Sequence, residues 1–212
     1  LEFRRVLFRS TDGGSVETYR TMIRQMDEGI GRILAALKAA GLADNTLTVF
    51  TSDNGGERFS DTWPFVGKKM DLLEGGIRVP LLAHWPRRIA GGHVTGQTAI
   101  TMDWPATMLE AAGVAPHADY PLDGQSLLPV LTDPGRTTSR DLFWRMNHRQ
   151  QKAVRRGDWK YLSLEGDEFL YDLSLDSRER ANLAQRQPER LKELRAAYAA
   201  WETTMPGIPA DA

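Results

Sequence analysis

The chain has 212 residues, of which 41 % are hydrophobic and 26 % are charged, a balance typical of a globular protein. Its formal net charge of −1 gives no indication of a nucleic-acid or anionic-membrane partner. No run of about 18 apolar residues predicts a transmembrane helix, and the absence of cysteine excludes disulfides and a cysteine nucleophile within these residues.

The first ten residues, LEFRRVLFRS, contain neither an initiating methionine nor the apolar core of a signal peptide. Their end, Val-Leu-Phe-Arg-Ser, resembles the translation of a common sequencing adapter. We interpret residues 1–10 as a sequencing or translation artefact and leave them out of the fold prediction. The alternative is a basic, amphipathic lead-in to the following helix. Under the artefact interpretation, we expect the chain to be the tail of a longer protein.

The first predicted helix covers about residues 19–40, where apolar side chains recur at three- and four-residue steps. Lys38 lies in the last turn, and Gly41 is placed where a helix stops. We expect the apolar stripe to pack against a sheet rather than to bind a cofactor; it consists of Tyr19, Met22, Ile23, Met26, Ile30, Ile33, Leu34 and Leu37.

A short buried strand is predicted over Thr46–Ser52, because residues 48–51 are β-branched or aromatic. Asp53 and Asn54 follow the strand, and two glycines then allow a sharp turn and a close approach of the backbone. Carboxylate and amide oxygens favour Ca²⁺ or Mg²⁺ over zinc or copper. The alternative is an ordinary turn, since Asp-Asn-Gly is common turn chemistry.

Further along the chain, an irregular loop is predicted over 57–64, followed by a second buried strand at Val79–His84 that we expect to lie beside the first. Thr98–Thr101 is a candidate short strand, and a helix is expected from Asp103, as its N-cap, to Gly113. A short helical turn is predicted over 126–131.

Turn-forming residues cluster over 132–140 and predict a domain boundary. Beyond it, four short strands separated by tight turns predict antiparallel hairpins, at 142–145, 151–155, 159–164 and 169–173. A helix that starts at Pro188 and reaches about Thr203 closes the chain; its apolar face contains Leu191, Leu194, Tyr198 and Trp201.

Four segments, in their order and spacing, resemble sulfatases of the alkaline-phosphatase-like superfamily. They are the helix with Met26-Asp27 and Ile30-Gly31, the turn 51–56, Lys69 with 74–80, and Leu170–Leu173 with Asp176, Glu179 and Asn182. The resemblance covers Tyr19 to Trp201. It implies an α/β fold: residues 11–135 form the later part of a sulfatase-type α/β sandwich, and residues 136–212 form a small antiparallel sheet with a packed C-terminal helix.

The resemblance also implies a site. Asp53 and Asn54 would be ligands of Ca²⁺, or occasionally Mg²⁺, and Lys69 would be a catalytic residue that contacts the sulfate. Lys68 is the alternative for that contact, and a solvated surface pair is the alternative for both lysines. His148 and Arg145 are candidates for contacting the organic part of the substrate, although surface exposure is the simpler interpretation.

Three other polar residues receive structural interpretations. We interpret His84 as a core or rim histidine, because it lies inside an apolar strand. Arg78 is expected to pair with a carboxylate such as Glu74. Asp103 is interpreted only as the helix cap mentioned above.

The sulfatase nucleophile, a cysteine of a Cys-x-Pro-x-Arg-type motif that is oxidised to formylglycine, has no counterpart in these residues. The early paired aspartates and the upstream lysine and histidines are absent too. We therefore expect half of an active site, inactive alone, from a parent that hydrolyses a sulfate monoester of a sugar or aryl group. The compartment stays unknown, since the signal region of an exported bacterial sulfatase would lie upstream.

Two other functions stay open. A phosphate or phosphonate ester hydrolase of the same superfamily is one, although two-metal phosphatases typically have Asp-His where this chain has Asp53-Asn54. The other is an inactive fragment or a non-catalytic binding protein. The expected partner is a small-molecule or glycan sulfate ester, without nucleic acid or membrane and with no prediction of oligomeric state.

Overall fold

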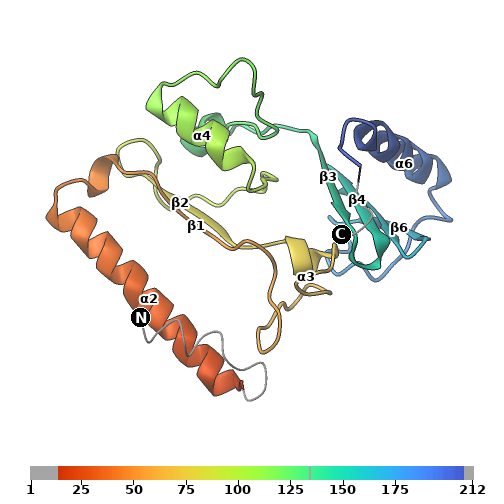
Figure 1. Cartoon of the computed structure of the whole chain (residues 1–212), viewed down its shortest axis with the longest axis horizontal. Coiled ribbons are helices and arrows are strands. Elements are labelled where there is room, and N and C mark those ends of the chain that lie inside the picture. Colours follow the sequence, from red (N-terminus) through yellow and green to blue (C-terminus); the bar gives the residue numbers. More distant parts are fainter. Residues whose placement is uncertain (1–13, 134, 208–212) are drawn as a thin grey trace.

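The computed structural model describes residues 14–133 and 135–207, and its two ends differ in how they are packed (Figure 1). A long helix and a two-stranded ribbon form the N-terminal end, and a four-stranded sheet with a helix forms the C-terminal end. The short helix α3 (Glu74–Ile77) lies between them. The predicted artefact at residues 1–10 lies outside the described residues. None of the described helices is both long and apolar enough to cross a membrane.

The first helix, α2, runs from Val16 to Ala39 and confirms the predicted amphipathic helix. Ser15 caps it, since its side chain accepts a hydrogen bond from the Thr18 N–H, and Gly41 ends it in the left-handed conformation. The predicted packing of its apolar stripe on a sheet is wrong for the described chain. No residue of α2 is buried, and Ile33 is 63 % exposed.

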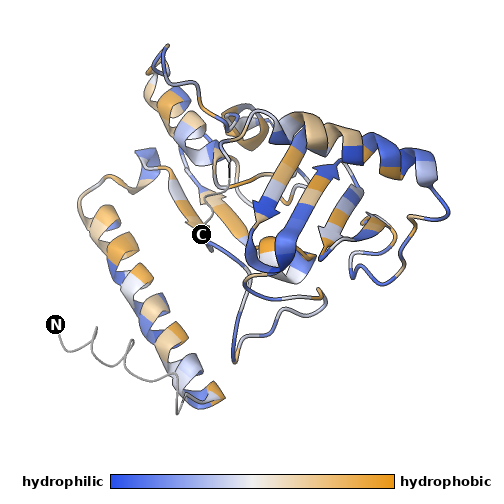
Figure 2. Cartoon of the chain, turned by 45° about the vertical axis from the view of Figure 1, so that its right-hand side comes forward, coloured by the Kyte–Doolittle hydropathy of each residue, from blue (hydrophilic) through white to orange (hydrophobic). Residues whose placement is uncertain are grey.

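The course of α2 explains this exposure. A 3₁₀ turn, η1 (Ala43–Asn45), connects α2 to the ribbon, and from there the helix diverges from the strands (Figure 1). Figure 2 shows apolar residues along the whole length of α2. The apolar pattern therefore identified the face that needs a partner, but the described residues do not supply one.

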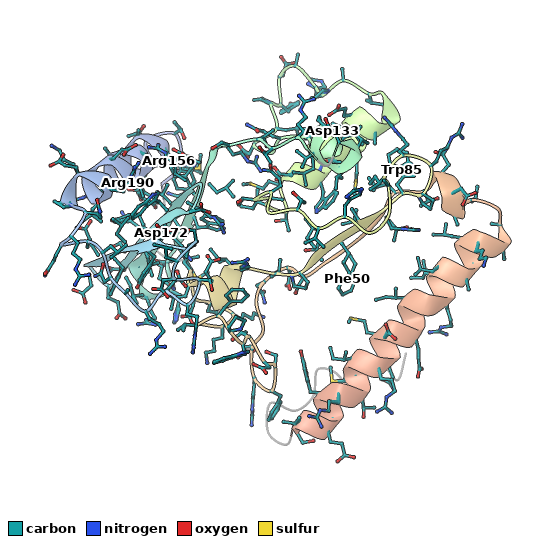
Figure 3. The ribbon with its side chains drawn as sticks, turned by 180° about the vertical axis from the view of Figure 1, so that it is seen from behind. Phe50, Trp85, Asp133, Arg156, Asp172 and Arg190 are labelled. Carbon is teal, nitrogen blue, oxygen red and sulfur yellow. The ribbon has the colours of Figure 1, made fainter. Side chains whose placement is uncertain are left out.

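Strands β1 (Thr48–Thr51) and β2 (Leu81–His84) pair antiparallel, with Thr48 opposite His84, which confirms that the two predicted strands are neighbours. The expected burial is wrong: Leu82 is 63 % exposed, and His84 is exposed rather than in a core. The reason is that a ribbon of two strands cannot cover its own faces. Phe50 projects from this ribbon and is partly exposed as well (Figure 3).

The predicted strand at Thr98–Thr101 is not formed. The neighbouring Gln97 instead joins this segment to Thr138 through its side chain, which donates to the Thr138 carbonyl and accepts from the Thr138 N–H. One side-chain amide thus replaces a ladder of backbone hydrogen bonds. The segment has no strand partner among the described residues.

Helix α4 runs from Asp103 to Ala112, and Gly113, with a φ of 70°, ends it as predicted. The interpretation of Asp103 as the N-cap is wrong, because Asp103 is the first helical residue and is fully buried. Its carboxylate accepts from the N–H groups of Ile100 and Gln125, both at 2.9 Å, and pairs with Arg140. Asp103 therefore ties α4 to two loops. Helix α5 (Leu128–Thr132) is the predicted short helical turn.

The C-terminal sheet has the order β3-β4-β5-β6, all antiparallel, which confirms the predicted hairpins. Its strands are Asp141–Met146, Gln151–Arg156, Trp159–Leu164 and Asp167–Asp172. Gly157 and Gly166 have positive φ values in the two tight turns. Helix α6 (Pro188–Glu202) then packs on one face, as predicted.

Both faces of this sheet are covered, which is why its core is complete. On one face, a cluster joins the sheet to α6 and consists of Val154, Tyr161, Leu170, Leu191, Leu194 and Tyr198. On the other face, Ala153, Leu162 and Tyr171 pack with Leu72, which comes from the segment before α3. The C-terminal sheet is thus the surface on which the Lys69 segment rests. The domain division at residue 135 stays a prediction.

Candidate active site

The turn after β1 places a carboxylate and an amide side by side. Ser52 donates through its hydroxyl to the Asn54 carbonyl at 2.9 Å, and the Asn54 N–H donates to Asp53 Oδ1 at 2.9 Å. The side-chain amide of Asn54 donates to the Gly55 carbonyl, which leaves its Oδ1 as the atom for a ligand. Asp53 is exposed and Asn54 is partly buried. Both are thus at the carboxyl end of the strand, as predicted.

Gly55 brings this turn against α3. Its N–H donates to the Gly76 carbonyl at 2.7 Å, and a Cβ added at Gly55 would lie 1.8 Å from the Gly75 oxygen. A Cβ on Gly75 or Gly76 would also collide with backbone oxygens, at 2.3 and 2.1 Å. The three glycines are therefore required by the close approach of two backbones rather than by flexibility.

Lys69 is attached to the same turn through its main chain. Its N–H donates to the Gly56 carbonyl at 2.8 Å, and the next residue, Met70, has a φ of 76°. Asp71 closes the loop by accepting from the Lys68 N–H. Lys68 and Lys69 are both exposed, and neither forms an ion pair with a described carboxylate. The ammonium group of Lys69 is therefore available to an anion.

His148 lies in the β3–β4 connection, η2 (His148–Gln150), and its side chain is exposed. Gln151 joins this connection to the segment that follows Lys69, because its amide nitrogen donates to the carbonyls of both His148 (3.0 Å) and Met70 (2.8 Å). The amide oxygen of Gln151 accepts from the Leu72 N–H at 2.8 Å. The structure thus brings the backbone of His148 beside the backbone that follows Lys69. Arg145 donates instead to the carbonyl of Pro206.

The donor set at the turn suits part of a calcium site. Asp53 and Asn54 supply two hard oxygen ligands, whereas Ca²⁺ takes about six to eight oxygens. Within residues 14–133 and 135–207, no group of three or more His, Asp or Glu side chains is arranged to hold a metal ion. The turn therefore fits a metal as a contributor of two ligands.

A buried ionic cluster lies behind α3, and its central residue was not predicted. Lys160 on β5 is 0 % exposed and its Nζ lies 2.9 Å from Glu74 Oε1 and 2.8 Å from Glu179 Oε1. Glu179 Oε2 also accepts the N–H of Glu74 at 2.6 Å. Burial is the main cause that raises the pKa of Glu179, and the charge of Lys160 opposes it. The sequence signal that could have identified Lys160 is a lysine on the apolar face of a predicted strand.

Three arginines lie in this region. Arg78 lies 3.6 Å from Glu74 Oε2, which confirms the predicted pairing, and it also stacks on Phe65. Arg155 lies at the same distance from Glu74 Oε2. Arg178 covers the ring of Trp63, so the predicted irregular loop before Lys69 is also in contact with the C-terminal region. The loop segments around Lys69 thus rest on the sheet at several points.

Comparison with known proteins places this geometry in a family. Human N-acetylgalactosamine-6-sulfatase is 39 % identical over 132 residues, which cover 59 % of this chain and 25 % of that protein. Mouse steryl-sulfatase is 35 % identical over 147 residues, which cover 65 % of this chain and 24 % of that protein. The chain therefore spans about a quarter of the length of the curated relatives it matches.

Solved structures support the same fold. Ps i-CgsB superposes with a TM-score of 0.80 at 26 % identity, over 92 % of this chain and 45 % of that one. BT4656, in complex with its substrate D-Glucosamine-2-N, 6-O-disulfate, gives a TM-score of 0.70 at 27 % identity, over 85 % of this chain and 39 % of that one. The predicted α/β fold with its antiparallel sheet and C-terminal helix is confirmed.

Two family models match overlapping parts of the chain. Residues 5–114 match the model described as Sulfatase, and residues 62–198 match the model described as N-sulphoglucosamine sulphohydrolase, C-terminal. The two matches overlap over the segment that contains Lys69 and α3. The chain belongs to the sulfatase family.

Proposed function

We propose that this chain is the C-terminal part of an enzyme that hydrolyses a sulfate monoester, and that it contributes Asp53, Asn54 and Lys69 to the active site. The observation that carries the proposal is the pair of main-chain hydrogen bonds between the two site segments, Lys69 N–H to Gly56 O and Gly55 N–H to Gly76 O. They hold the main chain of Lys69 against the turn that carries Asp53 and Asn54. Family membership supplies the reaction class.

The proposed roles follow from the charge of the reaction. A sulfate ester is an anion whose transition state spreads negative charge over several oxygens, so cationic groups fixed near it lower the barrier. The exposed ammonium of Lys69 would bind the sulfate and stabilise that charge. Asp53 and Asn54 would hold Ca²⁺, or Mg²⁺, which supplies further positive charge when bound. The nucleophile, proposed to be formylglycine, would come from residues outside this chain.

The proposed substrate is a sulfated sugar or aryl sulfate. Relatives named N-acetylgalactosamine-6-sulfatase and Arylsulfatase D represent both possibilities, and BT4656 was solved with a sulfated glucosamine. His148 is proposed to contact the organic part of the substrate, supported by its position beside the Met70 backbone.

The test compares sulfate and phosphate monoesters of the same aryl alcohol, assayed with the full-length protein. We expect turnover of the sulfate ester, and its loss in Asp53→Ala together with loss of bound metal measured by elemental analysis. Asp61→Ala, an exposed aspartate in the next loop, is the matched control and should retain metal and activity. Preference for the phosphate ester, or full activity of Asp53→Ala, would contradict the proposal.

A further inference from the structure

The buried ionic cluster is unusual because it places two carboxylates and one ammonium out of contact with water. Lys160 and Glu74 are 0 % and 1 % exposed, and Glu179 is buried with them. Desolvating three charged groups is expensive, and a well-packed apolar replacement is often as stable or more stable. Simple stability is therefore a weak reason for this cluster, and a requirement for one defined geometry is a stronger one.

A continuous set of contacts leads from this cluster to Lys69. Glu179 and Lys160 fix both the backbone and the carboxylate of Glu74, the first residue of α3. The next two residues, Gly75 and Gly76, have no room for a Cβ, and the Gly76 carbonyl accepts the Gly55 N–H. The Lys69 N–H donates a hydrogen bond to the carbonyl of Gly56, the residue after Gly55. A displacement of Glu74 would therefore be transmitted to both site segments.

Gln151 provides a second connection from the sheet. It is 2 % exposed, and its amide contacts the main chain on both sides of Asp71, at Met70 and at Leu72. Met70, adjacent to Lys69, has a positive φ that a non-glycine side chain rarely adopts. A backbone in that conformation needs neighbours that define it, and Gln151 is one of them.

We propose that Lys160 and Gln151 on the C-terminal sheet, with Glu179 from the loop after β6, are positioning residues that align the Lys69 ammonium for sulfate binding. This inference rests on the proposed role of Lys69. It assigns to the C-terminal sheet a function in catalysis beyond support of the fold. Since a shift of about 1 Å in a binding group can cost on the order of 10²-fold in rate, small movements of α3 are sufficient.

The informative variant is Glu179→Gln in the full-length protein. Both contacts of Glu179, the Lys160 ammonium and the Glu74 N–H, are hydrogen-bond donors. The two donors meet different oxygens of the carboxylate, Oε1 for the Lys160 ammonium and Oε2 for the Glu74 N–H, and an amide replaces one of these oxygens by an NH₂ group and must lose one of the contacts. The change leaves Lys160 paired with Glu74. Lys160→Met would instead leave two buried carboxylates without their ammonium, and we expect it to unfold the sheet.

The measured quantity is the inhibition constant of inorganic sulfate, determined at a temperature where circular dichroism shows the variant fully folded. We expect Glu179→Gln to weaken sulfate inhibition roughly 10-fold. Val154→Ala is the control, because Val154 is fully buried in the same sheet but faces α6. It should lower the melting temperature without changing the sulfate constant. If Glu179→Gln does not fold, Gln151→Met is measured in the same way, with the same expected weakening.

A double-mutant cycle separates positioning from general disruption. If Glu179 acts through Lys69, Glu179→Gln should have no further effect on sulfate inhibition in the Lys69→Ala background. Unchanged sulfate inhibition in Glu179→Gln, or the same weakening with and without Lys69, would overturn the inference while the role of Lys69 stands. Unchanged inhibition in Lys69→Ala alone would overturn both, because no binding group would remain to be positioned.

Discussion

The β1–β2 ribbon and the β3–β6 sheet contain similar apolar strands, yet only the sheet forms a core. Leu170 on β6 is fully buried, whereas Leu82 on β2 is mostly exposed. The sheet has α6 on one face and the Leu72 segment on the other, while the described residues leave the ribbon and α2 uncovered. The packed core of the described residues therefore lies at the C-terminal end, and the proposed site residues lie at the edge of that core.

This difference predicts where a truncated side chain costs stability. Leu194 of α6 is 0 % exposed, so Leu194→Ala should lower the free energy of unfolding by about 2–5 kcal/mol. Ile33→Ala removes an exposed side chain of α2 and should change it by less than about 0.5 kcal/mol. Urea titration of this chain at low protein concentration, followed by circular dichroism, measures both. Similar losses for the two variants would contradict this, because they would show that α2 is packed as tightly as α6.

Alkaline pH provides a second probe of the packed sheet. Burial, reinforced by the charges of Glu179 and Asp176, raises the pKa of Tyr171 from 10.0 to about 12. Between these values the unfolded state loses the phenol proton while the folded state retains it. The free energy of unfolding should therefore fall as the pH rises from about 10 to about 12, by about 2 kcal/mol at most from this residue.

Tyr171→Phe should remove this contribution to the fall in the free energy of unfolding at alkaline pH, as measured by urea titrations across this pH range. Tyr120→Phe, which removes an exposed phenol, is the matched control and should keep the wild-type dependence. An unchanged pH dependence in Tyr171→Phe would contradict the burial of this phenol.

The smallest expected effect is in Ca²⁺ binding by Asp53 and Asn54 when this chain is studied on its own. Two ligand side chains fall well short of the coordination that Ca²⁺ requires, so titration calorimetry should show binding weaker than about 10⁻³ M. Asp53→Ala serves as the baseline. Tight binding that depends on Asp53 would mean that this chain contains a complete calcium site.

Local structure was largely predictable, because it depends on signals that are local in the sequence. The period of the apolar residues predicted α2 and α6, and glycine-containing turns predicted the hairpins around β5. The Asp53–Gly56 turn followed from its own residues. Strand pairing between β1 and β2 followed from the proline and glycine boundaries of both segments.

Burial and long-range polar contacts were not predictable in the same way, since they depend on what the fold brings to a surface. Asp103 had the sequence of a helix cap, but its carboxylate joins two loops and Arg140. Lys160 carries a charge in a strand, and only the fold shows that two glutamates from distant segments surround it. The β2 strand was apolar enough for a core, yet the described residues leave Leu82 mostly exposed.

The central claim, that Lys69 is the sulfate-binding residue of this segment, is tested most directly by steady-state kinetics of Lys69→Ala and Lys68→Ala in the full-length protein. The two lysines are adjacent and both exposed, so the second variant controls for charge and solubility. We expect Lys69→Ala to lower turnover of a sulfate ester by about 10²- to 10³-fold, typical of one lost charge-stabilising donor. Lys68→Ala should have a much smaller effect. Equal and minor effects of the two substitutions would contradict the account.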